Sequence, residues 1–170
     1  MLREKIRLFP DPVLRRKAEV VTSFDHSLAV LLETLQRTMR AQPSGVGIAA
    51  PQVGVARQVA VVDVSPRVPG AKLLVLINPK IIDMRDPIPS REGCMSLPDY
   101  TANLKRFRWI RFVAQNPDGT WYEKTSEGIE AVCVQHEVDH LAGLLFFDRV
   151  VSLKTDMFPR RIFTKRRPAA

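Results

Sequence analysis

The sequence predicts an α+β fold in which mostly antiparallel strands pack around a helix near the C-terminus. Strand-like runs dominate the middle of the chain, one helical pattern precedes them, and a second helical pattern follows them. This order differs from the alternation of strands and helices that is typical of parallel α/β sheets. A length of 170 residues corresponds to one domain.

Residues 26–42 are expected to form the first helix. Leu28, Leu31 and Leu35 recur at helical spacing. Asp25 stands immediately before them, where an N-cap residue is favoured. The segment therefore predicts an amphipathic helix with a defined start.

The strands are expected between the two helices. Runs of strand length, rich in β-branched residues or leucine, occupy 58–64 and 73–77. Several prolines and glycines in 80–98 predict short strands and loop there. A turn rich in Asn, Pro, Asp and Gly then joins a long strand, 105–115, to a partner at 121–123, which predicts a hairpin.

A second helix is expected at about 127–143, with Ser126 as a candidate N-cap and Gly143 near its end. It contains an H-E-x-x-H sequence, in which His136 and His140 lie one helical turn apart and can bind one metal ion. The fold therefore centres on a metal-binding helix.

A third protein ligand is needed, because catalytic sites usually combine three protein ligands with one open position. The candidates are Cys94, Cys133 and a carboxylate. Cys133 lies on the same helix as the histidines, where three stacked side chains cannot easily converge, so core packing is the favoured interpretation. Cys94 follows Gly93 in a segment whose glycine and nearby proline suit an irregular but ordered backbone, which allows the cysteine to approach the two histidines.

Composition excludes several classes of protein. With 45% hydrophobic and 26% charged residues, the chain matches ordinary globular proteins and not disordered ones. We expect no membrane partner, because every apolar run is far shorter than a membrane span. The charged N-terminus argues against a signal peptide. Two cysteines fit a reducing cytosol, so we expect a cytoplasmic location.

Positive charge is concentrated at the C-terminal end. Of the formal net charge of +8, residues 151–170 carry +5, from six Lys or Arg and one Asp. We expect residues 1–150 to form the single functional domain and residues 151–170 to form a basic tail. Such a tail suggests contact with RNA or another anionic surface, and a solvated solubilising tail is the alternative.

Three short motifs together resemble one known family. They are Gly45-x-Gly47-x-Ala49-Ala50-x-Gln52, Glu92-Gly93-Cys94-x-Ser96 and Gln135-His136-Glu137-x-x-His140. In order and spacing the chain is similar to the peptide deformylases over residues ~5–150. The resemblance implies a peptide deformylase-like α+β fold. It also implies a metal-dependent hydrolase that removes formate from the initiator N-formyl-methionine of nascent bacterial or organellar polypeptides.

The resemblance also assigns site residues. It implies Cys94, His136 and His140 as metal ligands, typically to Fe²⁺, with Zn²⁺, Ni²⁺ or Co²⁺ possible. Glu137 would act as general base and then acid. The remaining positions would serve the oxyanion and the peptide: the Gln52 amide and the backbone N–H of Met95 as hydrogen-bond donors, and Gly47 where the peptide backbone passes.

The partners expected are N-formyl-Met nascent peptides and ribosomal RNA through the basic tail, with no DNA. One alternative is a zinc metallopeptidase, because many such enzymes share H-E-x-x-H. Against it, the chain has only one further histidine, His26, which stands at the start of the first helix and is expected at the surface. The other alternative is a nucleic-acid-binding protein with a structural zinc, which would need a fourth protein ligand.

Overall fold

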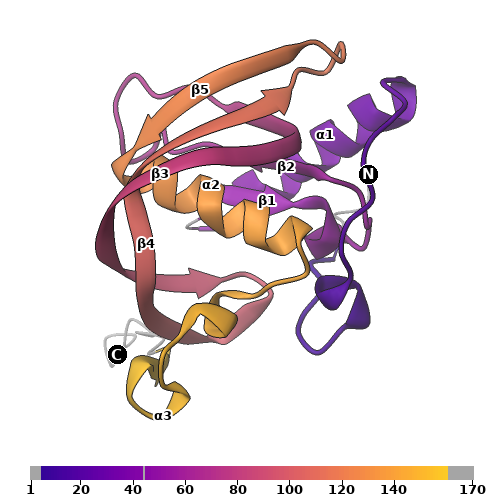
Figure 1. The fold of residues 1–170 in the computed structure, drawn as a ribbon. Coiled ribbons are helices and arrows are strands. Elements are labelled where there is room, and N and C mark those ends of the chain that lie inside the picture. The colour runs from indigo at the N-terminus through magenta and orange to yellow at the C-terminus, as the bar shows by residue number, and fades with distance from the viewer. Residues whose placement is uncertain (1–4, 44, 161–170) are drawn as a thin grey trace, which may run out of the picture.

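The computed structural model describes residues 5–43 and 45–160. In it, a curved antiparallel sheet wraps around helix α2 (Gly128–Leu141), as Figure 1 shows. The strands follow the order β1-β2-β3-β4-β5, and β6 pairs with β4. The expected α+β class is confirmed. The strands are β1 (Gly47–Ala49), β2 (Val59–Val62), β3 (Leu74–Cys94), β4 (Leu97–Gln115), β5 (Trp121–Glu127) and β6 (Met157–Pro159).

The helices are α1 (His26–Arg40), α2 (Gly128–Leu141) and the short α3 (Leu153–Asp156), with 3-10 helices η1 (Pro12–Arg15), η2 (Ala50–Val53) and η3 (Phe146–Arg149). The predicted N-cap of α1 is confirmed: the Asp25 carboxylate accepts hydrogen bonds from the backbone N–H groups of Ser27 and Leu28. No helix in the described part of the chain has the length and hydropathy to cross a bilayer.

The prediction of short strands and loop at 80–98 was wrong. β3 runs from Leu74 to Cys94 and pairs with β4 along almost its whole length. Pro87 and Pro89 are two residues apart, so their missing N–H groups belong to the same edge of the strand. Beyond Ile77, β3 has a strand neighbour on one edge only among the described residues, so the ladder tolerates both prolines.

The predicted N-cap of α2 was wrong, although the helix begins at Gly128, one residue from its expected start. The N-cap is Glu127, and Ser126 belongs to β5. Ser126 is buried, and its hydroxyl donates a hydrogen bond to the Glu130 carboxylate at 2.6 Å. It therefore joins the end of β5 to the first turn of α2 by a side-chain contact instead of capping the helix.

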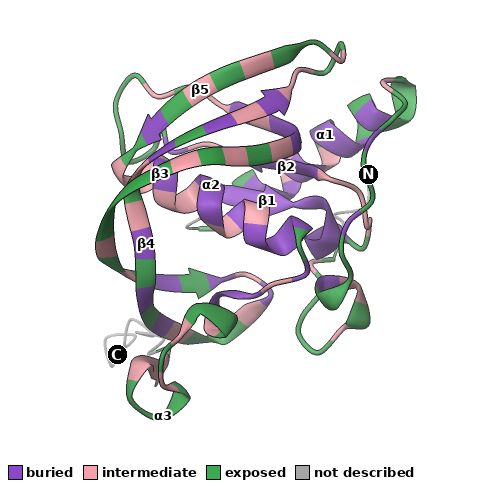
Figure 2. Ribbon diagram, in the orientation of Figure 1, coloured by how far each residue is buried: buried purple, intermediate pink, exposed green. Residues whose placement is uncertain are grey.

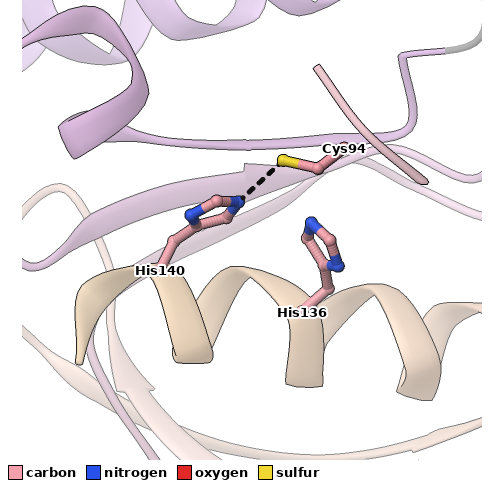
Figure 3. Close-up of side chains that lie close together, drawn as sticks. All are labelled: Cys94, His136 and His140. Atoms are coloured by element: carbon pink, nitrogen blue, oxygen red, sulfur yellow. Dashed lines mark hydrogen bonds between the residues drawn. The ribbon is translucent and has the colours of Figure 1, made fainter. Parts of the chain in front are cut away.

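The core lies on two sides of the short strands β1 and β2. On one side, α1 packs its leucines and Met39 against them. On the other side, α2 packs Ala131 and Val134 into a cluster with Ile110 and Phe112 of β4. Figure 2 shows buried residues along α2 and an alternation of buried and exposed residues along β4. This packing holds α2 in the concave side of the sheet, where its histidines face the end of β3 (Figure 3).

Part of the predicted tail belongs to the sheet. The three residues of β6 pair with Tyr100, Thr101 and Ala102 of β4. The division of the chain at residue 150 stays a prediction. The end of the tail, 161–170, lies outside the described residues.

Helix α2 ends at a left-handed glycine, Gly143, with φ of +76°. A Cβ at this position would lie 2.6 Å from the carbonyl oxygen of Arg15. We expect Gly143→Ala to lower the free energy of unfolding by about 1–2 kcal/mol through its φ and by about 1–3 kcal/mol more through the overlap. Urea unfolding measures the loss.

The matched control is Gly70→Ala, since Gly70 has φ of +83° and no atom within 4 Å of the added Cβ. It should lose only the conformational part, about 1–2 kcal/mol. Equal losses in the two variants would show that the contact with Arg15 has no energetic weight.

Candidate metal centre

Cys94, His136 and His140 lie together between the end of β3 and helix α2. One ligand atom from each lies within 4.8 Å of the other two, and the Cys94 Sγ is 3.2 Å from the His140 Nε2. Figure 3 shows both imidazole rings rising from α2 toward the sulfur. Within the described ranges this is the one group of three or more His, Cys, Asp or Glu side chains with metal-site spacing.

The His136 ring is oriented by a buried carboxylate. Its Nδ1 donates a hydrogen bond to the Glu92 Oε2 at 2.9 Å, which leaves Nε2 available as a ligand atom. Burial raises the pKa of Glu92, but hydrogen bonds from His136 and Arg106 outweigh it and lower the pKa to about 2. Glu92 is therefore a stable anion that fixes the tautomer of His136.

Arg106 of β4 holds this carboxylate in place. Its guanidinium contacts both oxygens of Glu92, at 2.8 and 3.0 Å, and donates to the Asp139 carboxylate at 2.6 Å. Arg149 binds the same Asp139 from outside. The group links β3, β4 and α2 through the buried charges of Glu92, Arg106 and Asp139, and the exposed Arg149 of η3 supplies the second positive charge that balances them.

The Cys94 thiol is prepared to lose its proton. Burial raises its pKa, but the positive field of His140 and hydrogen bonds with both histidines outweigh burial and hold the pKa well below its ordinary value. The Ser96 backbone N–H also points at the sulfur, 3.4 Å away. A thiolate with two imidazoles is a donor set that suits divalent transition metals, so these residues fit a bound ion.

Glu137 is buried on α2, next to the histidines. Its Oε2 has no hydrogen-bond partner among the described residues, and burial raises its pKa to about 7. Gly47 of β1 lies against it so closely that a Cβ at Gly47 would overlap the Glu137 Oε1. Both residues line the same cavity. A glycine is therefore required here for the carboxylate to reach the cavity.

Gln52 and Met95 lie on the same cavity. The Gln52 Oε1 accepts a hydrogen bond from the backbone N–H of Ala49 at 3.0 Å, which fixes the direction of the amide. The amide Nε2 then points to the Ser96 hydroxyl, 3.1 Å away, and to the Cys94 sulfur, 3.5 Å away. A preorganised N–H donor thus stands beside the metal-ligand group. Met95 follows Cys94 in the turn between β3 and β4.

The family model described as polypeptide deformylase matches residues 3–156. A peptide deformylase of Thermodesulfovibrio yellowstonii is 40% identical over 162 residues, which are 95% of this chain and 98% of the relative. One of Heliobacterium modesticaldum is 44% identical over 140 residues, 82% of this chain and 89% of the relative. The crystal structure of peptide deformylase from Thermotoga maritima superposes with a TM-score of 0.82 at 38% identity, covering 89% of this chain and 100% of that one.

The chain belongs to the peptide deformylase family. Peptide deformylases are hydrolases that release the N-formyl group of new polypeptides, and this chain is one of them. The resemblance seen in the three motifs is confirmed. Membership of this family replaces the two alternative functions, a zinc metallopeptidase and a nucleic-acid-binding protein with a structural zinc.

The deformylase cavity has a volume of 980 Å³ and extends from the metal-ligand group to the molecular surface. One part of its wall is apolar, and the sequence had given no indication of which residues form it. They include Ile88, Met95, Pro98, Ile129, Val132 and Cys133. These side chains come from the β3–β4 hairpin and from the first two turns of α2. This apolar part of the cavity therefore lies between the β3–β4 hairpin and the start of α2.

Two residues lie outside the metal-ligand group, as expected. Cys133 packs against the core cluster of α2 and lines the cavity, and burial raises its pKa to about 12. His26 is exposed at the start of α1.

Sequence reasoning missed the roles of Glu92, Arg106 and Asp139. The sequence held two signals for these roles. Glu92 belongs to the second motif but had no function assigned to it, and Arg106 is a basic residue within the alternating pattern of a strand.

Proposed function

We propose that this deformylase binds one divalent metal ion through Cys94, His136 and His140, with Fe²⁺ as the native ion and Zn²⁺, Ni²⁺ or Co²⁺ able to replace it. The convergence of these three donors supports the proposal. The thiolate character of Cys94 and the fixed tautomer of His136 add to it. When bound, such an ion supplies Lewis acidity and makes water a nucleophile near neutral pH.

Glu137 moves the proton in this proposal. Its carboxylate accepts a proton from the attacking water and then delivers it to the leaving amine. A pKa of about 7 suits both steps, because a group that titrates near the working pH can both accept and return a proton. Burial and the unpartnered Oε2 keep the carboxylate free for this task.

The oxyanion that forms at the formyl carbon accepts hydrogen bonds from the Gln52 side-chain amide and from the Met95 backbone N–H. The fixed direction of the Gln52 amide supports its part. Losing one such donor typically costs about 10²–10³ in rate. Gly47 leaves room for the peptide backbone beside Glu137.

The methionine side chain of the substrate occupies the apolar part of the cavity wall. A flexible thioether side chain packs well against apolar groups such as Met95 and Ile129. The formyl carbon carries only hydrogen besides its oxygen and nitrogen, so a narrow site beside Glu137 admits it and excludes larger acyl groups.

The decisive observation is the convergence of the three donors beside the buried carboxylate of Glu137. Metal analysis of protein purified without oxygen, combined with a formate-release assay, tests the proposal. Stoichiometric iron and activity that air destroys would support Fe²⁺, because iron and thiolate oxidise. Activity that survives prolonged aeration would contradict Fe²⁺ and favour zinc or nickel.

The basic tail is proposed to contact ribosomal RNA, since the substrate emerges from the ribosome. The charge of the tail supports this, and a solubilising tail remains the alternative. A cytoplasmic location, in bacteria or in an organelle, is part of the same proposal. It is supported by the bacterial relatives and by the two free cysteines.

We expect Glu137→Gln to retain the metal and to lose at least about 10²-fold in kcat, because the ligands remain and proton transfer does not. Metal content and formate release are measured on the same preparation. Glu123→Gln, in exposed β5, is the control and should keep full activity. Activity of Glu137→Gln within tenfold of the parent enzyme would show that Glu137 is not the base.

Cys94→Ser should lose the metal or bind it much more weakly, because a hydroxyl is a poor replacement for a thiolate ligand. Cys133→Ser changes the same atom in a residue outside the metal-ligand group and should keep stoichiometric metal. Metal content by mass spectrometry compares the two variants. The reverse pattern would make Cys133 the third ligand.

Deleting residues 161–170 should leave deformylation of a short formyl-peptide intact and weaken co-sedimentation with ribosomes. The deletion starts at residue 161 because Pro159 ends β6 and Arg160 lines the cavity. It removes four positive charges, so the lost binding should be the part that falls steeply with salt. Equal co-sedimentation of both proteins at low salt would remove the tail from ribosome binding.

A further inference from the structure

Strand β6 brings Arg160 to the mouth of the catalytic cavity. β6 pairs with the first part of β4, and the Arg160 backbone N–H continues this pairing with a 2.7 Å hydrogen bond to the Asp99 carbonyl. Phe158 of β6 supports the neighbouring Arg91, whose guanidinium carbon lies 4.2 Å from the centre of the phenyl ring. Backbone pairing and ring contact thus attach the start of the tail to the β3–β4 hairpin.

The Arg160 guanidinium lies directly against Gly93. A Cβ at Gly93 would overlap the Arg160 Nη2, so this contact requires the glycine. Gly93 immediately precedes the proposed ligand Cys94, and both residues line the cavity with Arg160 and Arg91. The Cα atoms of Gly93 and Cys94 are only about 3.8 Å apart, so a guanidinium against Gly93 lies close to the metal-ligand group. It is within reach of the first few residues of a peptide whose reacting end is bound there.

The charge facing solvent in this cavity is positive. Arg67, Arg91 and Arg160 line it and are exposed, whereas its acidic residues, Glu92 and Glu137, are buried. Across the described residues, none of the three arginines has a carboxylate within 4 Å. Arg91 donates to neutral oxygens, the Thr101 hydroxyl at 3.0 Å and the Asn103 amide at 3.5 Å.

We propose that Arg160, together with Arg91, selects substrates that carry an acidic side chain in the first two residues after the formyl-methionine. Guanidinium groups bind carboxylates through charge-assisted hydrogen bonds, and these two have no carboxylate partner in the described chain. A peptide is favoured over RNA as the ligand because both groups line the cavity that contains Glu137 and Cys94. The inference rests on the proposed reaction site, which sets the direction of the bound peptide.

The test compares kcat/KM for matched formyl-peptide amides, formyl-Met-Ala-Glu-NH2 against formyl-Met-Ala-Gln-NH2 and formyl-Met-Glu-Ala-NH2 against formyl-Met-Gln-Ala-NH2. The C-terminal amide removes a second carboxylate that could occupy the arginines. An exposed ion pair contributes up to about 1 kcal/mol, so the parent enzyme should prefer Glu to Gln by up to about fivefold at one of the two positions. The preference should lie in KM and decrease with salt.

Arg160→Gln and Arg91→Gln should each reduce the Glu-to-Gln ratio toward one, and Arg160→Lys should retain part of it. The control is Arg111→Gln, an exposed β4 arginine that does not line the cavity, which should keep the parent ratio. An unchanged ratio in Arg160→Gln, or no preference in the parent enzyme, would overturn the inference.

Two further measurements distinguish peptide selection by Arg160 from RNA binding and from a failure of the proposed base. Unchanged peptide ratios together with weaker ribosome co-sedimentation of Arg160→Gln would overturn the inference and assign the residue to RNA. The proposed reaction residues are tested separately by formate release from the Gln peptides, which needs no acidic side chain. If Glu137→Gln kept full activity on the Gln peptides, the proposed base would fail while the Glu-to-Gln ratio would still report on Arg160.

Discussion

The guanidinium of Arg106 is the contact on which the metal-ligand group depends. It binds Glu92 of β3 through both oxygens and Asp139 of α2, although all three residues are almost fully buried. Removing one member of such a group typically costs about 3–5 kcal/mol, because the others remain charged without compensation. Since Glu92 also holds the His136 ring, the same contact that joins sheet and helix sets the orientation of a proposed ligand.

Two glycines let charged groups approach the cavity. At Gly47 the absent side chain makes room for the Glu137 carboxylate, and at Gly93 it makes room for the Arg160 guanidinium. The first approach concerns a buried acid whose pKa is raised by burial. The second concerns the guanidinium of Arg160, an exposed cation that follows β6. The cavity therefore combines a buried carboxylate at its inner end with exposed positive charge at its mouth, as the two proposals, chemistry at Glu137 and selection at Arg160, require.

Local patterns predicted the helices better than the long hairpin. The spacing of leucines and the Asp25 cap gave α1 almost to the residue, because helix formation depends on neighbours three and four positions apart. Pro87 and Pro89 suggested a loop, yet both lie in β3. Whether a proline interrupts a strand depends on which edge has a partner, and that depends on the position of β4.

The sequence by itself determined the family and the H-E-x-x-H helix, and it predicted Cys94 instead of Cys133 as the third ligand, because motif order and helical spacing are properties of the chain. Only the tertiary structure decided that Arg106 joins Glu92 to Asp139, which residues form the apolar cavity wall, and that β6 places Arg160 beside Gly93. These contacts join residues far apart in the chain. They arise from the register and curvature of β3 and β4, which no local pattern encodes.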